Sequence, residues 1–195
     1  MRFFIALEIP EESRQELEAV QKRLKELFPE IRLTDNDKLH LTIAFVGEQP
    51  DYLRQSLTIA LERAAEGLSS FEVTPAYIDG FPHLHGADIL WVGVKGDIDQ
   101  LFVARERVKD ELVRIGLDVD ERRYIPHVAV AKANRLNLLP EQEKELENIM
   151  HDTFQPIRIT SLKLFESIPQ EGFHKHNTLA EIPLQPYCEI GPNES

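Results

Sequence analysis

The chain has 195 residues, 42% of them hydrophobic, which is enough for one sizeable apolar core. Its formal net charge of −12 excludes a broad, non-specific grip on nucleic acid, because such binding depends on many Lys and Arg contacts to phosphates. The single cysteine, Cys188, excludes an internal disulfide and a cysteine metal cluster. No apolar run approaches the ~20 residues that span a bilayer. We therefore expect a cytoplasmic, monomeric protein with no membrane segment.

The hydrophobic pattern predicts alternating strands and helices along the chain. The first half contains a strand at 3–9, a helix at 11–28, a strand at 39–46, a helix at 51–66 and a strand at 71–78. After a loop at 79–88 the pattern restarts with a strand at 89–94, a helix at 97–115, a strand at 124–131, a helix at 140–150 and a strand at 157–165. A last strand at about 178–184 precedes a tail, 186–195, that we expect to fray.

A histidine occupies the same position in both halves. His40 follows Phe3 by 37 positions and His127 follows Ile89 by 38, and the next strand begins 31 positions after His40 and 30 after His127. This agreement is typical of an internal duplication. It predicts a single bilobal domain, 1–195, in which halves of about 1–80 and 88–166 are related by a pseudo-two-fold axis and share a cleft.

Each of these histidines precedes or begins an apolar strand. Because strand side chains alternate, His40 and Thr42 share one face while Leu41 and Ile43 face a core. A histidine near its ordinary pKa of about 6.5 can act as a base when neutral and as an acid when protonated. Two opposed histidines therefore suit a displacement at phosphorus that needs no metal, and the Thr42 hydroxyl is placed to donate to a phosphoryl oxygen.

With these two histidine motifs the chain resembles the two-histidine (2H, LigT-like) phosphoesterases, specifically the RNA 2′,3′-cyclic phosphodiesterases. Their hallmark is a pair of His-x-Thr/Ser-x motifs with hydrophobic x, and the segment from His40 to Ile43 matches it fully. The second copy reads His127-Val128-Ala129-Val130, so Ala129 replaces the expected hydroxyl. Residues 2–11, 45–48, 90–94, 126–128 and 164–167 also look like the family, and the likeness extends to about residue 184.

The resemblance implies an α+β fold with two mainly antiparallel sheets, flanked by helices, around a central cleft. It also implies metal-independent hydrolysis of a 2′,3′-cyclic phosphate at an RNA or oligonucleotide 3′ end, or of a cyclic nucleotide, to a 2′-phosphate. No cofactor is implied. By the same resemblance His40 is the general acid and His127 the general base, although the quasi-symmetric sequence does not itself fix that direction.

Other residues near the motifs are candidates for substrate binding. Arg123 and Lys132 lie close in sequence to Ala129 and are candidates to hold the phosphate in place of its missing hydroxyl, although a solvated basic rim explains them equally well. Tyr124 and Phe173 are candidates to stack on bases, whereas Trp91 is expected in the core. The histidine pairs 83/85 and 174/176 have metal-ligand spacing but no third ligand, and we expect loop histidines near the mouth of a cleft.

Two alternatives stay open at this stage. Loss of the hydroxyl at Ala129 is compatible with a weakened or non-catalytic module that binds nucleotides or RNA ends on the same scaffold. Within the enzyme class, a 2′,5′-linkage phosphodiesterase or the reverse, ligating reaction is the other alternative.

Overall fold

The computed structural model describes residues 1–150 and 153–186, so all but the first residue of the predicted tail lies outside the described residues. The elements are β1 (Arg2–Glu8), α1 (Glu11–Leu27), β2 (Arg32–Leu33), the 3₁₀ turn η1 (Asn36–Lys38), β3 (His40–Glu48), α2 (Leu53–Ala65), β4 (Phe71–Phe81), β5 (Ile89–Gly96), α3 (Ile98–Arg114), β6 (His127–Lys132), α4 (Pro140–Ile149), β7 (Ile157–Ile159), β8 (Ser161–Gln170) and β9 (Phe173–Pro183). Among these residues no helix is long and apolar enough to cross a membrane.

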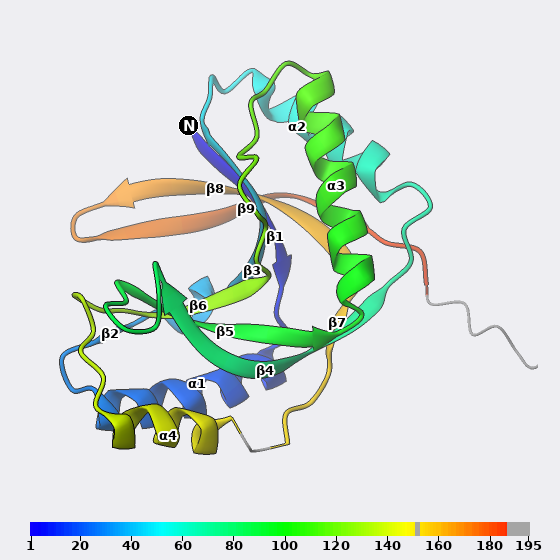
Figure 1. Cartoon of the computed structure of the whole chain (residues 1–195). Coiled ribbons are helices and arrows are strands. Elements are labelled where there is room, and N and C mark those ends of the chain that lie inside the picture. The colour runs from blue at the N-terminus through cyan, green and yellow to red at the C-terminus, as the bar shows by residue number, and fades with distance from the viewer. Residues whose placement is uncertain (151–152, 187–195) are drawn as a thin grey trace, which may run out of the picture.

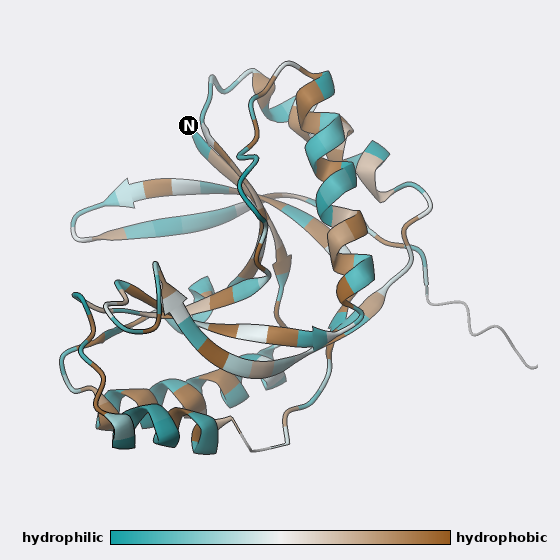
Figure 2. Cartoon of the chain, viewed as in Figure 1, coloured by the Kyte–Doolittle hydropathy of each residue, from teal (hydrophilic) through white to brown (hydrophobic). Residues whose placement is uncertain are grey.

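The strands form two antiparallel sheets, which confirms the predicted α+β fold. One sheet has the order β3-β1-β8-β9 and the other the order β2-β6-β5-β4-β7. Helices α2 and α3 lie beside the first sheet, and α1 and α4 cover the second (Figure 1). Helix α1 is amphipathic, and its buried face packs against β2 and β6. In Figure 2 brown, apolar segments follow the strands and the inner faces of the helices. Each lobe is thus a sheet with helices on one face, and its other face is left for the cleft.

The two halves of the sequence exchange a strand. The β1 strand of the first half pairs with β8 of the second, and the β5 strand of the second half pairs with β4 of the first. The sheets therefore do not coincide with residues 1–80 and 88–166. The single strand predicted at 157–165 is wrong for the same reason: it is two strands, β7 in one sheet and β8 in the other, and the chain changes sheets at Thr160.

Matching bulges interrupt the two strands that carry the motif histidines. Ile5 and Ala6 of β1 pair with Ala44 and Thr42, and so skip one residue of β3. Leu90 and Trp91 of β5 pair with Ala131 and Ala129 in the same way. An extra residue reverses the inward–outward alternation beyond it. The bulges thus bring Phe45 and Lys132, each five positions after its histidine, to the cleft, where strict alternation would have put residues 44 and 131.

The β8–β9 hairpin projects past the body of its sheet (Figure 1). It turns at Gly172, whose φ of 81° suits a residue without a Cβ. Strand β9 begins at Phe173, earlier than the predicted start at about residue 178. Figure 2 shows that the projecting part is largely hydrophilic, so its strands lack the apolar runs that reveal the other strands in the sequence.

Candidate active site

A cleft of about 1310 Å³ lies between the two sheets, and both motif histidines line it. His40 is the first residue of β3 and His127 the first residue of β6. In each strand the residues that follow alternate between the cleft and the core, so that Leu41 and Val128 are 1% exposed. Both motif histidines thus line one cavity, which is what a two-histidine active site requires.

The His127 ring is held in one tautomer. Its Nδ1 lies 2.7 Å from the carbonyl oxygen of Ile125, and because a carbonyl can only accept, Nδ1 carries the proton and donates. In the neutral ring this leaves the lone pair on Nε2. Burial lowers the pKa of His127, and the hydrogen bond to Ile125 opposes that effect. The lowered pKa favours the neutral form of the His127 ring.

Two phenylalanine rings and another imidazole lie close to the His40 ring. Its ring centroid is 4.7 Å from that of Phe165 and 6.0 Å from that of Phe4, whose rings stack on each other at 5.0 Å. A third imidazole, that of His176, lies 5.6 Å away. Burial, and secondarily the charge of His176, lowers the pKa of His40 to about 4. With this pKa, His40 is uncharged at neutral pH.

The pseudo-two-fold relation extends to the rings beneath the histidines. His127 meets the Phe81 ring edge-on at 4.9 Å and lies 5.5 Å from Trp91. Phe81 and Phe165 occupy equivalent places at the exchanged strands, so each histidine contacts one aromatic ring from a strand of the other half. Trp91 is 3% exposed, so the prediction that it is buried is confirmed.

Thr42 and Ala129 both line the cleft, two residues after their histidines. They are equivalent positions, since Ala6 of β1 opposes Thr42 and Trp91 of β5 opposes Ala129. Among the two motifs only Thr42 offers a hydroxyl. The difference predicted from the sequence is therefore a real asymmetry of the cleft.

The structure brings two of the other predicted binding residues to the cleft. Lys132 lines it through the β6 bulge. Phe173 lines it from the β8–β9 hairpin, with a side chain that is 53% exposed. The Nζ atom of Lys38 lies 5.5 Å from the centre of the Phe173 ring. The Lys38 ammonium thus lies over one face of the Phe173 ring.

Arg123 and Tyr124 do not line the cleft. The Arg123 side chain is exposed outside it. The Tyr124 hydroxyl donates to the carbonyl of Thr42 at 2.8 Å, and its ring packs on Phe102 and Arg105. Burial raises the pKa of this hydroxyl. The prediction that Tyr124 stacks on a base is thus wrong: the side chain fastens the loop before β6 to the motif strand β3.

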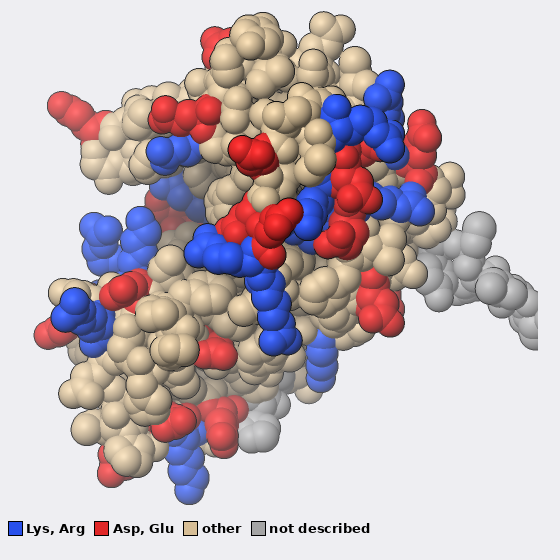
Figure 3. All heavy atoms as spheres, turned by 45° about the horizontal axis from the view of Figure 1, so that its top comes forward, with Lys and Arg blue, Asp and Glu red and all other residues tan. Residues whose placement is uncertain are grey.

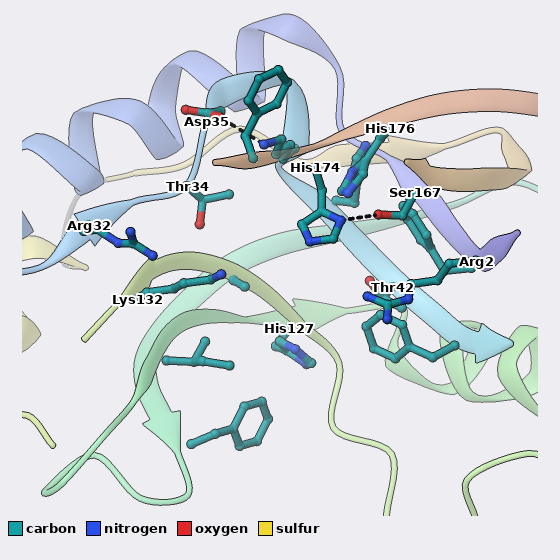
Figure 4. Close-up of a pocket in the computed structure, with 18 of the residues that line it drawn as sticks. Arg2, Arg32, Thr34, Asp35, Thr42, His127, Lys132, Ser167, His174 and His176 are labelled. Atoms are coloured by element: carbon teal, nitrogen blue, oxygen red, sulfur yellow. Dashed lines mark hydrogen bonds and ion pairs between the residues drawn. The ribbon is translucent and has the colours of Figure 1, made fainter. Parts of the chain in front are cut away.

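His174 and His176 line the cleft, but they do not lie on a loop as the sequence interpretation expects. Both lie on β9 and line the cavity, and His174 Nδ1 is 3.3 Å from the Ser167 hydroxyl (Figure 4). Their alternate spacing is the available signal, but the polar sequence around them is typical of a loop. The other pair lies outside the cleft lining, and His85 instead contacts Glu143 at 3.3 Å. Within the described residues, no group of three or more His, Cys, Asp or Glu side chains could hold a metal ion.

The cleft is basic although the chain is acidic. Among the described residues its lining contains one acidic side chain, Asp35, and the cationic side chains of Arg2, Arg32, Lys38, Arg122 and Lys132. Figure 3 shows Lys and Arg side chains around the recess at the left of the molecule, below the β8–β9 hairpin. A concave basic lining favours an anionic ligand.

Comparisons with known proteins agree with this geometry. A sequence model described as the 2′-5′ RNA ligase superfamily matches residues 32–167. An RNA 2′,3′-cyclic phosphodiesterase of Methanocaldococcus jannaschii is 24% identical over 169 residues, 86% of this chain and 91% of that protein. One from Thermotoga maritima is 29% identical over 161 residues, 82% of this chain and 81% of that protein.

Solved structures of Escherichia coli LigT have the same fold. The apo form superposes with a TM-score of 0.73 at 20% identity, covering 94% of this chain and 97% of LigT. The complex of LigT with 3′-AMP gives a TM-score of 0.71 at 21% identity with the same coverage. Fold and cleft together define a two-histidine phosphoesterase. The chain belongs to the 2′-5′ RNA ligase superfamily.

Proposed function

We propose that the protein hydrolyses a 2′,3′-cyclic phosphate at the 3′ end of an RNA or oligonucleotide to a 2′-phosphate, without a metal. The observation that carries this proposal is the shared cleft that His40 and His127 both line, each as the first residue of one of two pseudo-symmetric strands. The names of the relatives from M. jannaschii and T. maritima support the same activity.

In this mechanism His127 is the base. Its Nδ1–H is engaged by Ile125, so Nε2 accepts the proton of a water molecule as the water oxygen attacks phosphorus. A lowered pKa keeps His127 neutral and ready to accept that proton at neutral pH.

His40 is the acid. As the bond between phosphorus and the 3′ oxygen breaks, His40 gives its proton to that oxygen, which leaves a 3′-hydroxyl and a 2′-phosphate. With a pKa of about 4 the free enzyme has little charged His40 at neutral pH. A phosphate anion in the cleft raises the pKa of an adjacent imidazole, so the substrate itself supplies the charge that favours protonation.

Thr42 stabilises the charge that develops on the phosphoryl oxygens. Its side chain faces the cleft from the same strand as His40, and a hydroxyl so placed donates to an oxygen whose charge grows in the transition state. Ala129 supplies no equivalent donor. We expect a slower enzyme than one with both hydroxyls, but not an inactive one, because the acid and the base are both in place.

Product analysis tests the proposal. A 2′,3′-cyclic nucleotide is incubated with the wild type, His40→Ala and His127→Ala, and phosphorus NMR distinguishes a 2′-phosphate from a 3′-phosphate. We expect a 2′-phosphate from the wild type and at least a 10²-fold slower reaction from either variant. Binding of the cyclic nucleotide without any turnover by the wild type would leave only the binding-module alternative, and sensitivity to a chelator would contradict the metal-free mechanism.

A further inference from the structure

One end of the cleft, away from the histidines, carries a compact group of donors. Figure 4 shows Arg32, Thr34 and Lys132 together there, with His127 and His176 farther along the cavity. Arg32 and Lys132 come from the adjacent antiparallel strands β2 and β6, where their Cα atoms are direct partners. The backbone N–H of Thr34 continues this pairing with a 2.9 Å bond to the carbonyl of Val130.

The two cations in this group lack the partners that the other cleft cations have. Arg2 pairs with Glu48 at 3.7 Å and Lys38 with Asp35 at 3.1 Å. Arg122 contacts both carboxylate oxygens of Asp120 at 2.6–3.0 Å, and these bonds lower the pKa of Asp120 to about 2. Within residues 1–150 and 153–186, neither Arg32 nor Lys132 forms an ion pair.

The two positive charges of Arg32 and Lys132 repel each other, and a bound anion would remove this repulsion. Like charges directly opposite each other on neighbouring strands repel and destabilise the sheet. Both side chains are exposed and line the cleft, so the guanidinium, the ammonium and the Thr34 hydroxyl can contact one ligand. Planar guanidinium and compact ammonium groups are the side chains that proteins use to bind phosphate.

The position of the group separates it from the reacting phosphate. Lys132 follows His127 by five residues on the same strand, which corresponds to about 16 Å between their Cα atoms at the usual strand rise. This is several times the ~3.4 Å rise per nucleotide of a stacked strand. The cleft volume of about 1310 Å³ also exceeds the ~300–1,000 Å³ typical of a pocket for one small ligand.

We propose that Arg32, Thr34 and Lys132 form a phosphate subsite that binds a backbone phosphodiester of the RNA strand at least two nucleotides upstream of the reacting 3′ end. The subsite makes the enzyme select oligonucleotides over mononucleotides. This inference rests on the proposed function, since it takes the histidines as the position of the 3′ end.

The test uses the full chain with the double substitution Arg32→Gln/Lys132→Gln. The matched control is Lys95→Gln/Arg158→Gln, which makes the same charge change at exposed positions of the same sheet outside the cleft. The substrates are a pentanucleotide and a mononucleotide, each ending in a 2′,3′-cyclic phosphate. We expect the ratio of kcat/KM for the pentanucleotide to that for the mononucleotide to fall about tenfold in the cleft variant and to stay at the wild-type value in the control. An equal loss on both substrates would overturn the subsite.

A binding measurement keeps the subsite testable when no turnover occurs. Fluorescence anisotropy follows a labelled pentanucleotide with a 3′-phosphate at several salt concentrations. Removal of one cation–phosphate interaction should reduce the slope of log K against log salt by about 0.7 for a single strand. Failure of the wild type to hydrolyse either substrate would refute the proposed function alone. An unaltered salt slope in the cleft variant, or a weakened grip on a free nucleoside diphosphate without any effect on the pentanucleotide, would refute the subsite.

Discussion

The asymmetry between Thr42 and Ala129 makes a quantitative prediction. Thr42→Ala would give both motifs the same His-x-Ala-x form and remove the hydroxyl that we propose donates to the reacting phosphate. Removing one preorganised donor of this kind costs about 10²–10³ in kcat, or roughly 2.7–4 kcal/mol. The strand should keep its place, because the Tyr124 hydroxyl contacts the backbone carbonyl of Thr42 and not its side chain.

The reciprocal substitution tests the same idea in the opposite direction. Ala129→Thr adds a β-branched residue that strands favour, on a side chain that lines the cleft. We expect kcat to rise up to about tenfold. The assay is steady-state hydrolysis of a 2′,3′-cyclic nucleotide, with Thr58→Ala on α2 as the matched control, because its hydroxyl contacts only the Arg54 carbonyl far from the cleft. A Thr42→Ala enzyme with wild-type kcat would refute the assigned role.

Two further predictions concern pH and stability. The pKa values of both His40 and His127 lie below about 6.5, so the free enzyme loses its single catalytic proton as pH rises. The pH profile of kcat/KM should therefore peak below pH ~6.5. The profile of kcat should peak at a higher pH, because the bound anionic substrate raises the pKa values of both histidines. A value of kcat/KM that is flat between pH ~5 and ~8 would contradict this assignment. Tyr124→Phe should lower the free energy of unfolding by about 0.5–1.5 kcal/mol, because the hydrogen bond to the Thr42 carbonyl is removed. Urea denaturation measures this change, and an unchanged free energy would show that the bond does not stabilise the fold.

The sequence predicted the positions of the helices and strands better than it predicted which strands pair with each other. Apolar alternation and helix periodicity identify where strands and helices lie, because burial of one face is a local constraint. The exchange of β4 and β8 between the sheets has no such local signal, since either sheet would bury the same apolar residues. The interruption at Thr160, where the chain changes sheets, was missed for this reason.

The two histidines at the centre of the site were predicted from the sequence, whereas the strand geometry that brings the residues at its edges into the cleft was not. His40 and His127 follow from the repeated motif. Lys132 was proposed from its nearness to His127, but it reaches the cleft because of a bulge that only the pairing of β5 with β6 reveals. His174 and His176 lie on a polar hairpin whose strand character comes from pairing with β8 and not from hydrophobic periodicity.

The most direct test of the acid–base assignment changes the leaving group. A nucleoside phosphodiester whose leaving group is p-nitrophenolate needs no proton on the departing oxygen, so it makes the general acid dispensable. We predict that this substrate restores most of the rate lost in His40→Ala but none of that lost in His127→Ala, with the matched cyclic nucleotide as reference. Restoration in His127→Ala instead, or in neither variant, would contradict His40 as the acid and His127 as the base.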